Sequence, residues 1–148
     1  MMSTQVPAAF ATATTTRRPP AAWPPLALAV VCAAAYAIFF VMPYYVNDLD
    51  KLPLAEVAGG MHDPKDLWPR NGSGLAFVFT FGGLLTLALA PFGTIIAVGW
   101  AAINVALGRP SRDGLTVAIS ALAAAIGIVT LVWLASPFAS ALFTWWLD

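Results

Sequence analysis

Three long apolar runs that contain no charged residue constrain this chain more than any other feature. They cover Leu26–Val46, Leu75–Leu107 and Leu115–Leu147, which together make up more than half of the 148 residues. Each run exceeds the roughly 20 residues that an α-helix needs to cross the hydrocarbon core of a bilayer. A water-soluble helix needs a polar face opposite its buried one, and these runs have none. The sequence therefore predicts an all-α integral membrane protein, folded as a three-helix transmembrane bundle.

The composition agrees with a membrane protein and excludes several partners. Apolar residues make up 60% of the chain and charged ones 9%, compared with about 25% charged residues in globular domains. The formal net charge is zero and the basic residues are scattered, so no surface for nucleic acid is expected. The single cysteine, Cys32, cannot form an intramolecular disulfide and offers no thiolate pair to a metal. No cofactor and no small-molecule substrate can be identified. Abundant alanine with little lysine hints at a bacterial source.

Residues 1–25 differ from the rest of the chain. This tail is rich in Ala, Thr and Pro, and Arg17-Arg18 is followed directly by Pro19-Pro20. Prolines forbid a continuous helix, and the tail has little apolar surface to bury, so it is expected to be disordered. The run that follows is longer than the 7–15 residue core of a cleaved signal peptide, which favours a retained anchor. Residues 26–148 then form the membrane domain.

The predicted spans are residues 26–46, 79–100 and 115–135. The second run would measure about 50 Å as a straight helix, against about 30 Å of hydrocarbon. One helix with a kink near Pro91 fits this length, with Ala101–Leu107 emerging at the interface and Asn104 hydrated there. Two alternatives stay open: a re-entrant hairpin at residues 91–93, and an Asn104 that bridges helices. Pro43 marks the exit of the first span or a slight kink.

The third run contains a second helix start. Ser136 followed by Pro137 is typical of an N-cap and a first helical position, which predicts a short C-terminal helix over residues 137–147. This interfacial helix lies along the headgroup boundary or folds back on the bundle. Trp145-Trp146 and Trp68-Pro69 are expected to anchor the protein at the membrane–water interface. A tight turn at Gly108–Gly114 separates the second and third spans.

The loop over residues 47–74 is the only extended polar segment after the tail. It is expected to contain two helical turns, one at Leu52–Ala58 and one capped by Asp63. His62, Asp63 and Asp66 form the only cluster that resembles a metal or acid–base site, because imidazole and carboxylate both bind divalent cations. Adjacent residues seldom point at one ion, so a solvated polar loop is the favoured interpretation. No catalytic, cofactor-binding or metal residue is therefore assigned.

Basic residues indicate the orientation of the spans. Arg17, Arg18, Arg109 and Arg112 flank one side of a three-span protein, whereas acids predominate on the other side. The positive-inside rule then places the tail and the Gly108–Gly114 turn in the cytoplasm. Loop 47–74 and the carboxyl terminus face outward from the plasma membrane.

The functional prediction rests on what the spans contain. They carry no ionisable side chain, which a coupled transporter normally needs at membrane depth. Small residues recur at spacings of four, which favours close helix packing. These stripes are Ala29/Ala33/Ala37, Gly93/Ala97/Ala101, Ala121/Ala125 and Ala123/Gly127. The sequence predicts a non-enzymatic accessory or scaffolding subunit that packs against itself or a larger membrane complex. The alternative is a small transporter or channel subunit that oligomerises around the hydroxyl-bearing faces of the spans, which mutation of Asn104 and Thr94 would test. An enzyme that uses His62 and its acidic neighbours is a distant third.

Overall fold

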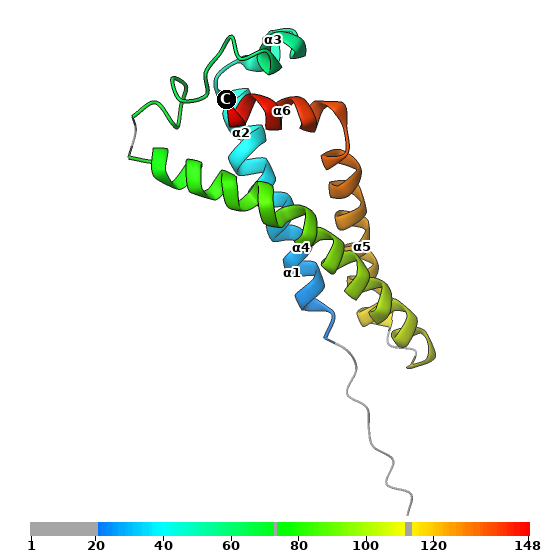
Figure 1. The fold of residues 1–148 in the computed structure, drawn as a ribbon. Coiled ribbons are helices and arrows are strands. Elements are labelled where there is room, and N and C mark those ends of the chain that lie inside the picture. The colour runs from blue at the N-terminus through cyan, green and yellow to red at the C-terminus, as the bar shows by residue number, and fades with distance from the viewer. Residues whose placement is uncertain (1–20, 73, 112–113) are drawn as a thin grey trace, which may run out of the picture.

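The computed structural model describes residues 21–72, 74–111 and 114–148, and every regular element within these ranges is helical (Figure 1). The tail prediction for residues 1–20 lies outside the described residues. The first apolar run forms a continuous rod. The elements in chain order are α1 (Trp23–Tyr36), η1 (Ala37–Val41), α2 (Met42–Val46), η2 (Leu49–Lys51), α3 (Leu54–Ala58), α4 (Ala76–Ser111), α5 (Gly114–Leu134) and α6 (Pro137–Leu147).

Three helices are long and apolar enough to cross a membrane, as the sequence predicts. They cover Trp23–Val46, Ala76–Leu107 and Gly114–Leu134, with mean hydropathies of 2.4, 2.0 and 2.4. Less than a third of each helix's most apolar stretch is buried inside the protein. Large apolar side chains such as Val129 and Val132 are instead more than two-thirds exposed. Continuous outward-facing apolar surface on this scale is suited to lipid and unsuited to water.

The bundle has two chemically different ends. α1, α4 and α5 each contact the other two, and the start of α1 lies at the same end of the bundle as the end of α4 and the start of α5 (Figure 1). We call this the turn end. At the opposite end, the loop end, α6 runs across the bundle and packs against α3 and η1 (Figure 1). The two halves of the 47–74 segment are held together here, since the Asn47 side chain both donates to the Trp68 carbonyl, at 2.7 Å, and accepts from the Trp68 amide, at 3.2 Å.

The first helix begins earlier than the sequence indicates. The tail was predicted to extend to Pro25, but α1 starts at Trp23 and includes Pro24 and Pro25 in its first turn. Amide groups in the first turn of a helix have no intrahelical partner, so a proline there forfeits no hydrogen bond. The proline pair therefore opens the first span.

A π-helical turn, η1, interrupts the first rod before Pro43. The Met42 amide donates to the carbonyl of Ala37, five residues earlier, and the rod then continues through α2 to Val46. Pro43 has no amide hydrogen to donate to the Phe39 carbonyl, and π-turns are found where the regular ladder is broken in this way. The predicted irregularity at Pro43 is thus absorbed by the preceding turn.

The second run forms one helix through Pro91. α4 continues without a break from Ala76 to Ser111, which contradicts the re-entrant hairpin at residues 91–93, and Figure 1 shows it bending along its length. Helical backbone satisfies its own polar groups, whereas a hairpin in lipid would leave them without partners. α4 also extends beyond the predicted end at Leu107. The tight turn expected over Gly108–Gly114 is therefore shorter, and residues 112–113 lie outside the described part of the chain.

The shape of the loop-end half depends on a glycine pair in α4. A Cβ atom at Gly82 would lie 2.2 Å from Phe39 Cζ, and one at Gly83 would lie 2.1 Å from Trp146 Cζ2. Both neighbours are rigid rings, which cannot move aside as a flexible chain can. One glycine therefore admits η1 against α4, and the next admits α6. Gly127 in α5 also permits close contact with α4, because a Cβ atom there would lie 2.4 Å from Val98 Cγ2.

Gly83→Ala should lower the free energy of unfolding by about 1–3 kcal/mol, because an added methyl group overlaps the Trp146 indole. Gly99→Ala is the matched control in the same helix, since no atom lies within 4 Å of its Cβ position. The control should be neutral or gain up to ~1 kcal/mol from helix propensity. Tryptophan fluorescence during denaturation in detergent micelles measures both. Equal midpoints for the two variants would contradict the proposed packing.

Candidate functional site

The His62, Asp63 and Asp66 cluster does not assemble into a ligand set. His62 Nε2 lies 3.2 Å from Glu56 Oε1 on α3, and Asp63 Oδ1 accepts from the Lys65 amide at 2.8 Å. The helical turn predicted here is confirmed: the Asp63 side chain caps it, and the Asp66 amide donates to the Asp63 carbonyl at 3.0 Å. Within the described ranges, no three His, Cys, Asp or Glu side chains are grouped so as to hold a metal ion.

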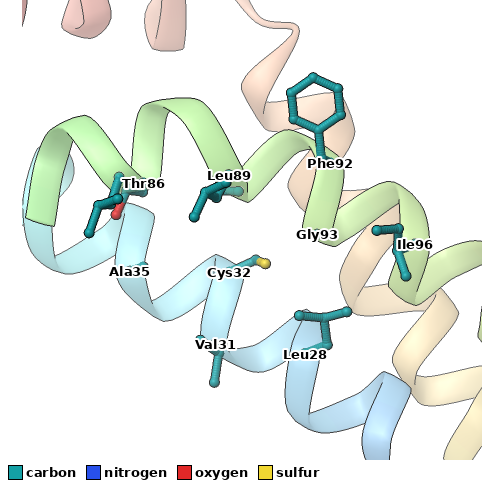
Figure 2. A pocket seen from close by; sticks show the side chains of 11 residues that line it. Leu28, Val31, Cys32, Ala35, Thr86, Leu89, Phe92, Gly93 and Ile96 are labelled. Carbon is teal, nitrogen blue, oxygen red and sulfur yellow. The ribbon is translucent and has the colours of Figure 1, made fainter.

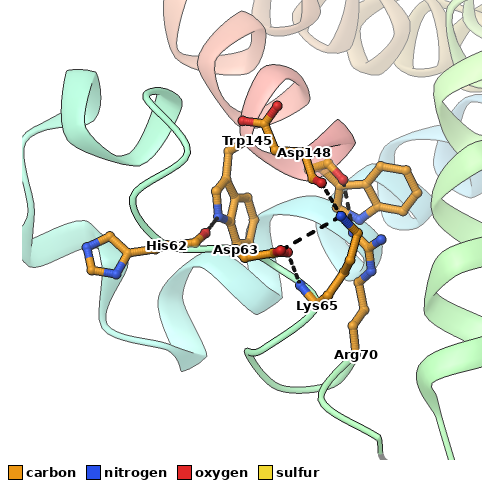
Figure 3. Close-up of polar contacts among 7 residues, drawn as sticks. His62, Asp63, Lys65, Arg70, Trp145 and Asp148 are labelled. Carbon is orange, nitrogen blue, oxygen red and sulfur yellow. Dashed lines mark hydrogen bonds and ion pairs between the residues drawn. The ribbon is translucent and has the colours of Figure 1, made fainter.

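The loop instead holds the carboxyl end of α6, as Figure 3 shows. The Arg70 guanidinium donates to the Trp146 carbonyl at 2.9 Å, and the Lys65 ammonium donates to the main-chain oxygen of Asp148. The last carbonyl groups of a helix lack intrahelical partners and carry partial negative charge, so cations there stabilise the helix. Two loop cations thus cap the final helix.

The loop cations differ in their surroundings: Arg70 is partly buried against α6, whereas Lys51 is exposed to solvent. Partial burial lowers the pKa of the Arg70 guanidinium below its ordinary value, and the Asp63 carboxylate offsets part of this. The guanidinium carbon also lies 4.7 Å from the centre of the Trp146 ring, a cation–π distance. Lys51 forms a hydrogen bond with Asp48 that raises its pKa, but both side chains are about two-thirds exposed. An exposed pair of this kind adds little stability.

Trp145 and Trp146 are not interfacial anchors, contrary to the sequence prediction. They are only 1% and 2% exposed, and the Trp145 Nε1 group donates to the His62 carbonyl at 2.8 Å. Trp146 packs against Phe40 with ring centres 5.3 Å apart. α6 folds back across the loop end, and this buries the pair in an aromatic core with Tyr36 and Tyr44. A buried indole needs a hydrogen-bond acceptor, and the loop supplies one.

Most polar side chains of the spans are buried. Thr94 and Thr130 donate to carbonyls four residues earlier in their own helices, at 2.7 and 2.8 Å, as expected for membrane helices. The hydration predicted for Asn104 is wrong: its side chain is 1% exposed and donates to the Ala21 carbonyl at 3.1 Å. A bridge between two helices, the open alternative, is also not what forms, because Ala21 precedes α1. The Asn104 amide instead ties α4 to the residues just before α1.

The small-residue stripes divide into two groups. Ala97 and Ala101 are fully buried, as are Ala29 and Ala123, so most of the stripes are used within this bundle. The Ala121/Ala125 stripe differs, because both residues are exposed. It forms one wall of a shallow groove of about 490 Å³ between α4 and α5, which we call the α4–α5 groove. This groove is lined by Ala102, Val105, Ala106, Ala121, Ala124, Ala125 and Ile128.

A second groove lies between α1 and α4 and has different walls. Figure 2 shows this α1–α4 groove, with a volume of about 440 Å³. Its lining is almost wholly apolar, with Cys32 and Thr86 the only residues bearing a sulfur or hydroxyl group. Gly93 lies at its floor, where a Cβ atom would come within 2.7 Å of the Cys32 sulfur. Cys32 thus serves as a small packing residue.

Sequence reasoning missed the residues that organise the loop end. No role was predicted for Arg70, or for Gly82-Gly83 within the second apolar run. The glycine pair itself carries a signal, since adjacent glycines weaken a helix and are kept where another element approaches closely. Arg70 carries no such local signal, because its partner Trp146 is 76 residues away in the sequence.

Arg70→Ala should loosen α6, because the Trp146 carbonyl loses its charged donor and the indole loses its cation. A hydrogen bond to a charged group contributes about 1.5–3 kcal/mol. Backbone amides of α6 should therefore exchange with deuterium about tenfold faster, measured by mass spectrometry of the full chain in detergent. Lys51→Ala serves as the control and should leave α6 unchanged. If the α6 amides exchange at the same rate in both variants, Arg70 does not hold the helix.

Comparison with known proteins adds no homologue: no protein-family model, curated protein or solved structure matches this chain. The geometry of the chain is therefore the only guide to its function. That geometry consists of a capped loop end, inward-pointing polar groups and two apolar grooves on the outside of the spans.

Proposed function

We propose that this chain is a non-enzymatic, multi-pass integral protein of the plasma membrane. It acts as an accessory or scaffolding subunit that packs its spans against a copy of itself or against a larger membrane complex. The observation that supports this function best is the α4–α5 groove, in which small side chains are concentrated on the outside of the bundle.

Residue size is what suits this groove to a helix. Helices in lipid gain no hydrophobic free energy by associating, so they associate where small residues let their backbones approach closely. Three of the four stripes are used wholly or partly inside the bundle, but Ala121 and Ala125 face outward beside Ala102 and Ala106. A further transmembrane helix seated there would meet alanine on both walls. This supports an intermolecular role for the stripe.

The alternative, a small transporter or channel subunit, has weaker support. A shared polar path would need hydroxyl or amide groups that face a neighbouring subunit. Thr94 and Thr130 donate within their own helices, and Asn104 donates to Ala21. These groups are at least nine-tenths buried within the chain. An accessory role accounts for this arrangement without further assumptions.

We further propose that the turn end faces the cytoplasm. The argument is the positive-inside rule, applied to Arg17, Arg18, Arg109 and Arg112. Within the loop, each of the three cations has a partner: Lys51 has Asp48, Lys65 has Asp63, and Arg70 has the Trp146 carbonyl.

The orientation can be tested with single cysteines in a Cys32→Ser background. Met61→Cys lies in the loop, at a position whose side chain is 73% exposed, and should react with a membrane-impermeant maleimide on intact cells. Ser3→Cys, in the amino-terminal tail, should react only after the cells are permeabilised. The reverse pattern would place the loop in the cytoplasm and overturn the proposed topology.

The scaffolding role can be tested by filling the α4–α5 groove. The complex isolated from native membranes in mild detergent should be larger than one chain by analytical ultracentrifugation. Ala121→Leu with Ala125→Leu should reduce the associated fraction about tenfold, a loss of ~1.4 kcal/mol. Val129→Leu with Val132→Leu, on an exposed face outside the groove, is the control and should have no effect. An unmodified chain that migrates strictly as a monomer would refute the proposal.

A further inference from the structure

We propose that Asn71 is a modification site, at which the side-chain amide is lost spontaneously and the product weakens the cap on α6. This inference does not rest on the scaffolding role, because it concerns the loop end and needs no partner chain. Asparagine is one of the thermolabile residues of proteins, and it reacts most readily where a glycine follows it in an accessible turn. Asn71 is exposed and is followed by Gly72.

The three asparagines of the chain differ in how firmly their side chains are held. The Asn47 side chain donates to two main-chain carbonyls, both at 2.7 Å. The Asn104 side chain is 1% exposed and donates to a third carbonyl at 3.1 Å. The residues that follow these two asparagines are Asp48 and Val105, which both carry side chains. Of the three, Asn71 alone combines exposure with a glycine after it.

The backbone at Gly72 leaves its amide nitrogen free of steric cover. Gly72 has a φ of 79°, in the left-handed region where a residue with a side chain would be strained. No atom lies within 4 Å of the position that a Cβ atom of Gly72 would occupy. One restraint opposes the reaction, since the Gly72 amide donates to the Arg70 carbonyl at 2.8 Å. This bond must break before the nitrogen can attack, so the folded turn slows the reaction without preventing it.

The chemistry needs only water as a co-reactant. The Gly72 nitrogen attacks the side-chain carbonyl carbon of Asn71, its proton passes to the amide nitrogen that leaves, and ammonia departs from a cyclic imide. The two reacting groups belong to adjacent residues, so the attack is intramolecular and its barrier is lower. Water then adds to one imide carbonyl and a carbon–nitrogen bond breaks. Opening at the side-chain carbonyl gives aspartate. Opening at the main-chain carbonyl gives isoaspartate, in which the chain runs through the former side chain.

The modification reaches α6 through the turn that carries Arg70. The Arg70 and Asn71 amides donate to the Leu67 carbonyl at 2.9 and 3.0 Å, and the bond from Gly72 to Arg70 closes the turn. Isoaspartate adds a methylene group to the main chain between residues 71 and 72, so the Gly72 bond cannot re-form in its present geometry. The turn positions the Arg70 guanidinium, which donates to the Trp146 carbonyl at the end of α6 (Figure 3). A looser turn therefore weakens this cap.

The site can be tested by ageing the full-length protein in detergent micelles at neutral pH and physiological temperature, followed by peptide mapping with mass spectrometry. Conversion at Asn71 should exceed that at Asn47 and Asn104 at least about tenfold, a barrier difference of ~1.4 kcal/mol. A protein isoaspartyl methyltransferase should methylate the aged chain but not the aged Asn71→Gln variant, because glutamine would have to close a larger ring. Absence of conversion at Asn71, equal conversion at all three asparagines, or methylation of the variant would overturn the proposal.

Hydrogen exchange on the same samples tests the effect on α6. Backbone amides of α6 should exchange about threefold faster in the aged protein than in the fresh one, as expected for the loss of one neutral hydrogen bond in the turn. Ageing should leave α6 unchanged in the Asn71→Gln variant. An exchange rate that ageing leaves unaltered in both proteins, or changes equally in both, would refute the link between Asn71 and α6.

Discussion

The absence of water from hydrocarbon governs how this bundle is held together. Burying one apolar helix face against another gains little when lipid tails are the alternative, so the helices depend on close contact between atoms. The described residues show where that contact is obtained: Gly82, Gly83 and Gly127 each face a side chain that would overlap a methyl group. Alanines that are fully buried, such as Ala97, extend the contact along the interface. The positions of glycine and alanine therefore determine where the helices can approach one another closely.

The loop end is stabilised by a different combination of forces. α6 carries its own start signal, since the Ser136 hydroxyl accepts from the Ala139 amide at 3.2 Å. Its carboxyl end has no comparable signal of its own and takes its donors from the loop, through Lys65 and Arg70. Between these two ends, the indoles of Trp145 and Trp146 fill the core formed with Phe40 and Leu142. The short final helix is thus fixed by hydrogen bonds at both ends and by apolar packing along its length.

Features of the fold that depend on neighbouring residues could be predicted from the sequence, whereas contacts between distant residues could not. The three apolar helices follow from composition over some 20 residues, and the Ser136 cap follows from two adjacent residues, so both were predicted correctly. Asn104 was misplaced because its partner, the Ala21 carbonyl, is 83 residues away, and Trp145 was misplaced for the same reason. His62, Asp63 and Asp66 were recognised only as residues of the right type. Their arrangement depends on α3 and on the α6 end, which no local pattern reveals.

The two outer grooves illustrate how residue size alone can separate two kinds of neighbour in a membrane. Both grooves are apolar and similar in volume, at about 440 and 490 Å³, so neither polarity nor capacity distinguishes them. Their walls do: alanine predominates in the α4–α5 groove, whereas leucine, isoleucine, valine and phenylalanine border the α1–α4 groove. Bulky walls hold a second helix away and cost it dispersion contacts, whereas alanine walls let its backbone approach. Of the two grooves, the α4–α5 groove is therefore the one whose walls allow close helix packing.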